Sequence, residues 1–170
     1  MTPYSREELL ALGFESVGAD VMVSRDVRFF AISGSLGDRV RIDTYSIVTG
    51  QVELGADVHI APLCFLSATG GRISMARGSG MGPQVAMLTR SDDYTTADLG
   101  AGDKLSGDII VGENSIIGAG CKILPGVTIG HDASIGTNCV ISRDVNAGDM
   151  IVSRGASNLT MGNRINGDSL

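Results

Sequence analysis

Large apolar side chains recur every six residues along most of this 170-residue chain. The most regular stretch runs from Leu105 to Val145, where a small or β-branched residue follows nearly every large one by four positions. A period of six fits neither the 3.6-residue period of an α-helix nor the plain alternation of an isolated strand. It is typical of a parallel β-helix, in which each hexapeptide supplies a short strand and a corner. The large residues of this stretch are Leu105, Val111, Ile117, Ile123, Ile129, Ile135 and Ile141.

The same six-residue step covers much of the chain before residue 105. It begins at Val17 and Val23 and continues through Phe29 or Phe30 with a slip of one residue. Each step predicts a strand that turns one large side chain into a shared core. The later members of this part are Leu36, Ile42, Val48, Leu54, Ile60, Leu66, Met75, Met81 and Met87.

Two interruptions break the six-residue step. Three extra residues, Arg72 to Ser74, precede Met75, and residues 93–104 leave the pattern altogether. In solenoids of this type, three hexapeptides complete one triangular coil. Counting by threes from Leu36 places both interruptions after the third side, so we expect them to stack at one corner. Loops extruded from a rigid scaffold commonly carry function.

The ends of the chain depart from the repeat. Ser5 and Glu8 form a capping-box pattern and Gly13 is a natural helix stop, which predicts a short helix over residues 6–12. Such a helix would cover the exposed core at the open end of a solenoid. The predicted organisation is a capping segment at residues 1–16, a β-helix domain at 17–155 with a loop at 93–104, and a polar tail at 156–170.

Composition and charge narrow the function classes. The 24 Gly suit many tight corners, and a net charge of −6 argues against a nucleic-acid or anionic-membrane surface. The sequence has no run of 18 apolar residues that would predict a membrane span, and no signal peptide with a positively charged N-terminal region. We therefore expect a cytoplasmic location. The three Cys, at positions 64, 121 and 139, fall on small inward positions and read as buried thiols.

Two parts of the sequence resemble a known family of enzymes. The segment from Ile117 to Gly136, followed by residues 140–145, resembles the C-terminal half of hexapeptide-repeat acetyltransferases, especially the galactoside and xenobiotic branch. Residues 91–94, together with the helix-like start and residues 59–61, resemble acetyltransferases that modify O-antigen sugars or nucleotide-linked amino sugars. The resemblance implies an all-β left-handed parallel β-helix that forms a homotrimer and binds acetyl-CoA between adjacent subunits.

Acetyl transfer to a sugar hydroxyl needs a general base, which is commonly a histidine. The chain has two His, and His131 falls in a corner between regular strands, where we interpret it as solvated surface. His59 comes at the end of its hexapeptide, where we expect a corner, and is the candidate base. The resemblance places a substrate-binding position of galactoside-type enzymes at Ala61, two residues further on.

Other site positions of the family are substituted in this chain. Its catalytic His corresponds to Asp92, which would act as a base only if burial or the adjacent Asp93 raised its pKa. Its substrate-binding Asp corresponds to Thr69, and Ser91 and Tyr94 are further candidate substrate contacts. These departures leave open whether His59 or a carboxylate is the base, and they favour an acceptor other than a galactoside, such as a nucleotide-linked amino sugar.

The cofactor positions of the family carry over more closely. The resemblance places pantetheine contacts at Ala119 and Thr137, and later coenzyme A contacts at Ser142 and Arg143. Arg143 replaces the usual Lys and is able to meet a phosphate of the cofactor. Arg154 and Arg164 are further cations near the expected end of the cofactor.

The sequence therefore predicts an acetyltransferase that moves an acetyl group from acetyl-CoA to a sugar hydroxyl or amine, in O-antigen or surface polysaccharide synthesis. No metal is expected, because a zinc site of the γ-carbonic anhydrase type on this scaffold needs three His and the chain has two. A non-catalytic β-helix scaffold remains the alternative. We expect His59 and Asp92 to lie on separate corners of one chain, so a shared site would need two neighbouring subunits.

Overall fold

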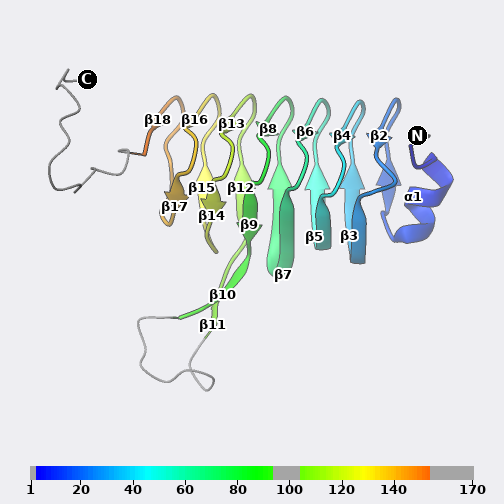
Figure 1. Cartoon of the computed structure of the whole chain (residues 1–170), viewed down its shortest axis with the longest axis horizontal. Coiled ribbons are helices and arrows are strands. Elements are labelled where there is room, and N and C mark those ends of the chain that lie inside the picture. Colours follow the sequence, from blue (N-terminus) through cyan, green and yellow to red (C-terminus); the bar gives the residue numbers. More distant parts are fainter. Residues whose placement is uncertain (1–2, 94–103, 154–170) are drawn as a thin grey trace, which may run out of the picture.

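The computed structural model describes residues 3–93 and 104–153. These residues form a parallel β-solenoid, with a single short helix at its N-terminal end and an antiparallel hairpin that projects from one edge (Figure 1). The all-β fold class predicted from the six-residue period is confirmed, and the architecture is consistent with a left-handed β-helix. In the part of the chain that the structure describes, each coil has three sides.

The first side is a parallel sheet of seven short strands, so the described chain completes about seven coils. Its strands are β2 (Met22–Val23), β4 (Arg41–Ile42), β6 (His59–Ile60), β8 (Gly80–Met81), β13 (Ile116–Ile117), β16 (Ser134–Ile135) and β18 (Met150–Ile151).

The second and third sides are joined by three long strands that bend around the corner between them. These are β3 (Arg28–Leu36), β5 (Ile47–Leu54) and β7 (Phe65–Met75). Beyond their first halves, the second side continues through β9 (Ala86–Leu88), β14 (Lys122–Ile123) and β17 (Val140–Ile141). The third side contains their last halves with β1 (Ser16–Val17), β12 (Ile109–Val111) and β15 (Thr128–Ile129).

The N-terminal helix α1 (Arg6–Leu12) closes one end of the solenoid, as the capping-box pattern predicts. The Ser5 side chain accepts a hydrogen bond from the Glu8 amide, and the Glu8 carboxylate accepts one from the Ser5 amide. These bonds satisfy amides that the first helical turn leaves unpaired. Leu9 is buried, so the helix turns an apolar side chain onto the open core.

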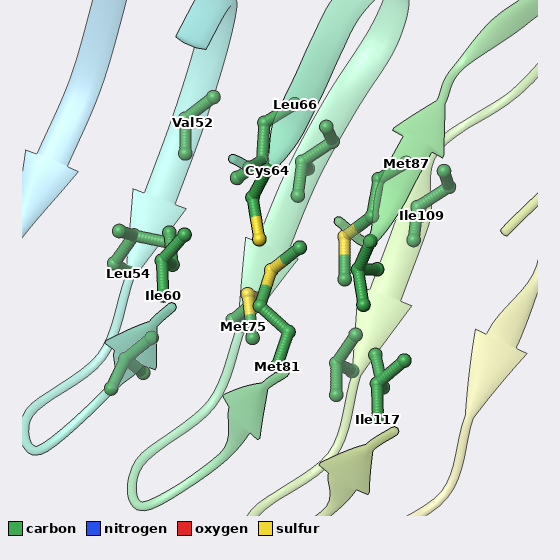
Figure 2. Packing of buried hydrophobic residues seen from close by; sticks show 14 of the residues in the cluster. Val52, Leu54, Ile60, Cys64, Leu66, Met75, Met81, Met87, Ile109 and Ile117 are labelled. Atoms are coloured by element: carbon green, nitrogen blue, oxygen red, sulfur yellow. The ribbon is translucent and has the colours of Figure 1, made fainter. Parts of the chain in front are cut away.

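The core is a column of the large residues that recur every six positions. Ile60, Leu66 and Ile117 are completely buried, and three methionines continue the same column across the middle coils (Figure 2). Packed apolar side chains of this kind are the main favourable contribution to folding. Of the predicted inward positions, Leu105 is the exception.

Leu105 lies outside the core. It belongs to the hairpin of β10 (Arg90–Asp92) and β11 (Lys104–Ser106), where it pairs with Ser91, and its side chain is 45% exposed. The inward residues of the next coil are instead Ile109 and Val111. The six-residue spacing from Leu105 to Val111 is therefore a coincidence, because antiparallel pairing carries this part of the chain away from the coil.

The two interruptions share one corner, as the count by threes predicts. The third side of that count, which starts from Leu36, is the second side described here. Both lie between the second and third sides, where the Gly70 amide donates to Thr89 Oγ1 at 3.0 Å and the Arg72 amide donates to Asp108 Oδ1 at 2.9 Å. The short insertion is shifted from its predicted place, however. Strand pairing matches Gly50 with Ala68 and Val52 with Ile73, so the three extra residues fall within 69–72 rather than at 72–74.

Candidate active site

His59 lies on the first side of the solenoid, at the start of β6, and not at a corner as its hexapeptide position suggests. Strand β6 pairs with β4 and β8, which puts Arg41, His59 and Gly80 in one outward row. The imidazole is 47% exposed, and its Nε2 lies 2.9 Å from Asp43 Oδ2. The imidazole is therefore open to solvent and held by a carboxylate at one nitrogen.

Asp43 is fixed from two directions. Arg41 Nε donates to its Oδ1 at 2.7 Å, and Arg41 donates a second bond to Oδ2 at 3.2 Å. Partial burial acts to raise the pKa of Asp43, but the hydrogen bonds from His59 and Arg41 outweigh it and hold the pKa below its usual value. The carboxyl group is thus ionised at neutral pH and acts as an acceptor.

A shallow groove lies beside His59, because Gly80 contributes no side chain to the outward row. Its floor is the sequence Gly78-Ser-Gly-Met-Gly82, and a Cβ built on Gly80 would meet the His59 carbonyl oxygen at 3.4 Å. His59 and Ala61 line one side of the groove, and Ile116 lines the other. The groove offers a polar wall with a candidate base and an apolar wall, which suits a ligand with faces of both kinds.

One of the two predicted pantetheine positions, Ala119, lies next to the rim of this groove. The Gly120 amide donates to the Pro83 carbonyl at 2.9 Å, which stacks the corner of Ala119 on the rim at residues 82–83. Thr137 stacks one coil further on, where the Asn138 amide donates to the Ala119 carbonyl at 2.8 Å. Within one chain, the structure therefore brings together His59 and Ala61 from the predicted acceptor set and Ala119 from the predicted cofactor set.

Ser142 and Arg143 lie at a different corner, where the second side ends after β17. Both are exposed and line a hollow that also includes Asp144 and Ile151. The second side separates them from Ala119 and Thr137. The predicted cofactor contacts thus form two groups that only an extended molecule would bridge.

The remaining predicted acceptor residues lie on the hairpin edge, across the triangular coil from the first side (Figure 1). Ser91 and Asp92 are on β10, Asp93 follows it, and Thr69 lies at the same corner on β7. Asp92 forms an ion pair with Lys104, and its side chain is 76% exposed. His59 and Asp92 are therefore far apart within one chain, as expected. Three further predicted positions, Tyr94, Arg154 and Arg164, lie outside the described residues.

The second histidine has a similar contact in another setting. His131 Nδ1 lies 2.7 Å from Asp132 Oδ2, and both side chains are well exposed. Backbone hydrogen bonds along this corner place His131 three coils beyond the coil of His59.

Burial raises the pKa of the Cys64 and Cys121 thiols, which favours their protonated, unreactive form.

Asp43 and Arg41 are site residues that the sequence reasoning missed. A signal for them was present, since a coil of three hexapeptides places Arg41 directly beside His59, 18 positions earlier. Strand alternation then turns Asp43 to the same outward side.

Among the described residues, no three His, Cys, Asp or Glu side chains gather as a metal site would require, and no helix is long and apolar enough to cross a membrane.

Comparison with known families identifies the repeat. Residues 107–143 match the family model described as bacterial transferase hexapeptide (six repeats). These residues thus carry the hexapeptide repeat, and the resemblance drawn from residues 117–145 is confirmed at the level of the repeat. No curated protein matches the chain.

Among solved structures, the chain is similar to AntD, an N-acyltransferase from Bacillus cereus. An AntD variant in complex with dTDP-4-amino-4,6-dideoxyglucose and coenzyme A has 28% sequence identity and a TM-score of 0.82, over 90% of this chain and 86% of that chain. AntD with dTDP and 3-hydroxybutyryl-CoA has 29% identity and a TM-score of 0.79, over 89% and 85%. A maltose O-acetyltransferase from Clostridium difficile 630, with 24% identity and a TM-score of 0.60 over 87% and 70%, shares the fold.

Proposed function

We propose that this protein is an acyltransferase that moves an acyl group, in the simplest case acetyl, from a coenzyme A thioester to the amino group of a nucleotide-linked sugar. The observation that carries the proposal is the similarity to AntD over nearly the whole chain, since AntD binds coenzyme A and a dTDP-linked amino sugar. We further propose that the reaction takes place in the cytoplasm and that its product enters O-antigen or surface polysaccharide synthesis.

His59 is the proposed base and the glycine groove the proposed acceptor site. The acceptor nitrogen gives a proton to His59 and attacks the thioester carbonyl carbon, the C–S bond breaks, and coenzyme A leaves as a thiolate that recovers a proton. Ala119 and Thr137 would guide the pantetheine arm toward the groove. Ser142 and Arg143, with Arg154 and Arg164 further along the chain, would meet the phosphate end of the cofactor.

A homotrimer would complete this site. The hairpin edge of one subunit lies opposite the groove in its own coil, and a closed three-fold ring would set it against the groove of a neighbour. Asp92, Asp93, Ser91, Tyr94 and Thr69 would then hold the sugar or its ammonium group. This arrangement gives the two separated sets of predicted acceptor residues a single role.

An exposed apolar patch supports the assembly. Ile47 and Phe65 pair in register on the second side, and the exposed side chains of Tyr45 and Leu63 lie at the adjacent corner. Tyr45 and Leu63 also adopt φ angles of 60° and 63°, a conformation that L residues rarely take. Large apolar side chains gathered in this way typically mark a protein interface.

Release of free thiol from acetyl-CoA, measured with and without a dTDP-linked amino sugar, tests the proposal. We predict that His59→Ala lowers turnover by roughly 10²–10⁴ while acetyl-CoA still binds, because a positioned base contributes about this much. His131→Ala is the matched control and should keep wild-type turnover. If no sugar tested increases thiol release by the wild-type protein, the result would favour a non-catalytic scaffold.

Acetylation of a sugar hydroxyl is the second candidate, and the His59–Asp43 contact favours it. A hydroxyl needs a base more than an amine does, because an amine is able to reach the site already neutral. Turnover with a hydroxyl acceptor that exceeds turnover with the matching amino sugar would select this candidate.

A further inference from the structure

We propose that Asp43 is a positioning residue for His59: it accepts a hydrogen bond from Nε2–H and so leaves Nδ1 as the nitrogen that takes the acceptor proton. This inference rests on the proposed role of His59 as base. Asp43 does not line the glycine groove, so its contribution acts through the orientation and tautomer of the imidazole.

The geometry fixes each atom of the contact. Arg41 donates to both oxygens of Asp43, at 2.7 Å to Oδ1 and 3.2 Å to Oδ2, and Oδ2 also faces His59 Nε2 at 2.9 Å. The Asp43 side chain is 18% exposed, which is less than either of its partners. Because both oxygens accept hydrogen bonds from Arg41 and the side chain is partly buried, rotation of the carboxylate is restricted. Oδ2 therefore faces the imidazole in one orientation.

The tautomer follows from this arrangement. An ionised carboxylate only accepts hydrogen bonds, and a neutral imidazole has one donor nitrogen and one acceptor nitrogen. Because Nε2 faces Asp43, the proton of the neutral ring lies on Nε2, and the free electron pair lies on Nδ1. Since His59 also lines the glycine groove, Nδ1 is the nitrogen left to serve a bound acceptor.

The charged groups near His59 come from β4, from the residue that follows it and from the corner before β6. Strand β4 brings Arg41, and Asp43 follows this strand directly. The corner before β6 brings Asp57, and Gly80 of β8 adds no charge. Asp57 is engaged elsewhere, since Arg39 Nε lies 2.6 Å from its Oδ1 and Arg77 Nε lies 3.4 Å from its Oδ2. Asp43 is therefore the carboxylate that contacts the imidazole.

Asp43→Asn should reverse the tautomer. The amide oxygen would keep the shorter bond, 2.7 Å from Arg41 Nε, which turns the amide NH₂ toward His59 and gives up the 3.2 Å bond from Arg41. Nε2 would then have to accept, so the ring proton would move to Nδ1 and block it as a base. We expect turnover to fall by about 10²-fold or more, since most of the contribution of a general base is lost, while the Michaelis constant for acetyl-CoA changes little.

Nitrogen-15 NMR of the histidine side chains, at a pH where both rings are neutral, reads the tautomer directly. The chain has two His, and His131→Ala assigns both sets of signals. We expect the protonated nitrogen of His59 to be Nε2 in the wild-type protein and Nδ1 in Asp43→Asn. A wild-type His59 protonated at Nδ1 would overturn the proposal without recourse to any variant.

Asp132→Asn is the matched control, because it alters the same kind of His–carboxylate contact three coils away. It should change the His131 signals and leave turnover at the wild-type level. Wild-type turnover in Asp43→Asn, or an unchanged His59 tautomer in that variant, would contradict the positioning role. If the His59 tautomers are as expected but the protein has no acyltransferase activity, the result would instead contradict the proposed function alone.

Discussion

His59 and Asp92 offer very different settings for a base. Asp92 is 76% exposed and paired with Lys104, so it lacks the burial that would make a carboxylate basic, and the ammonium group of Lys104 favours its ionised form. His59 is an imidazole, the side chain that most often serves as a general base, and it contacts Asp43 beside a groove. At the scale of single residues, the hairpin carboxylates are better suited to holding a sugar than to removing its proton.

Arg143 carries the second prediction at this scale. A charge-assisted contact to a phosphate contributes about 1.5–3 kcal/mol, so Arg143→Ala should raise the Michaelis constant for acetyl-CoA by about tenfold or more. The constant for the sugar should change little. Steady-state kinetics with each substrate varied in turn measures both constants.

Arg28→Ala is the control for Arg143, because Arg28 is also an exposed arginine but belongs to the N-terminal end of the second side. Its constants should match those of the wild-type protein. Equal constants for Arg143→Ala and the wild type would assign Arg143 to the solvated surface.

At the scale of elements, the long strands depend on close backbone contact where they bend. Gly50 of β5 has a φ of 82°, and a Cβ at this position would lie 2.0 Å from the carbonyl oxygen of Ala68 in β7. Gly126 has the same φ of 82°, but nothing lies within 4 Å of its Cβ position. Both glycines therefore adopt a backbone conformation that strains an L residue, but only at Gly50 is there no room for a Cβ atom.

Alanine substitution should therefore separate these two effects. Gly126→Ala should lower the free energy of unfolding by about 1–2 kcal/mol, the cost of an L residue at positive φ. Gly50→Ala adds a clash with a backbone carbonyl inside the sheet and should cost at least about 3 kcal/mol. Urea unfolding at equal protein concentrations measures both values, and equal losses would mean that β5 and β7 separate at the bend without penalty.

At the scale of the whole molecule, the hairpin edge and the groove lie on opposite sides of one coil, so a site that uses both needs two subunits. We predict that mixed trimers of His59→Ala chains and Asp92→Asn chains recover activity that neither variant has alone. Random pairing in a cyclic trimer would restore about one quarter of the sites. Turnover of the mixture, refolded together, is compared with that of the two variants refolded separately.

Light scattering provides the companion measurement. The assembly should have three times the 17.6 kDa mass of the chain. A monomer, or a trimer whose mixture shows no more activity than its components, would rule out a site shared between subunits.

Much of the fold was predictable from the sequence, because side-chain direction in a solenoid is set locally. Each hexapeptide turns its large residue inward, so every predicted inward position from Val111 to Ile141 is buried. The capping helix was predictable for the same reason, since Ser5 and Glu8 bond to amides within three residues. The shared corner of the two interruptions followed from counting alone.

Pairing between distant segments is what the sequence by itself did not determine. Spacing made Leu105 look like a core residue, and only the antiparallel pairing of β10 with β11 carried it into the hairpin. Likewise, the register of β4 against β6 was needed to bring Asp43 to His59. The repeat specifies which way a side chain points, whereas the stacking of coils decides which side chains meet, and the meeting of His59, Asp43 and the glycine groove belongs to the tertiary structure.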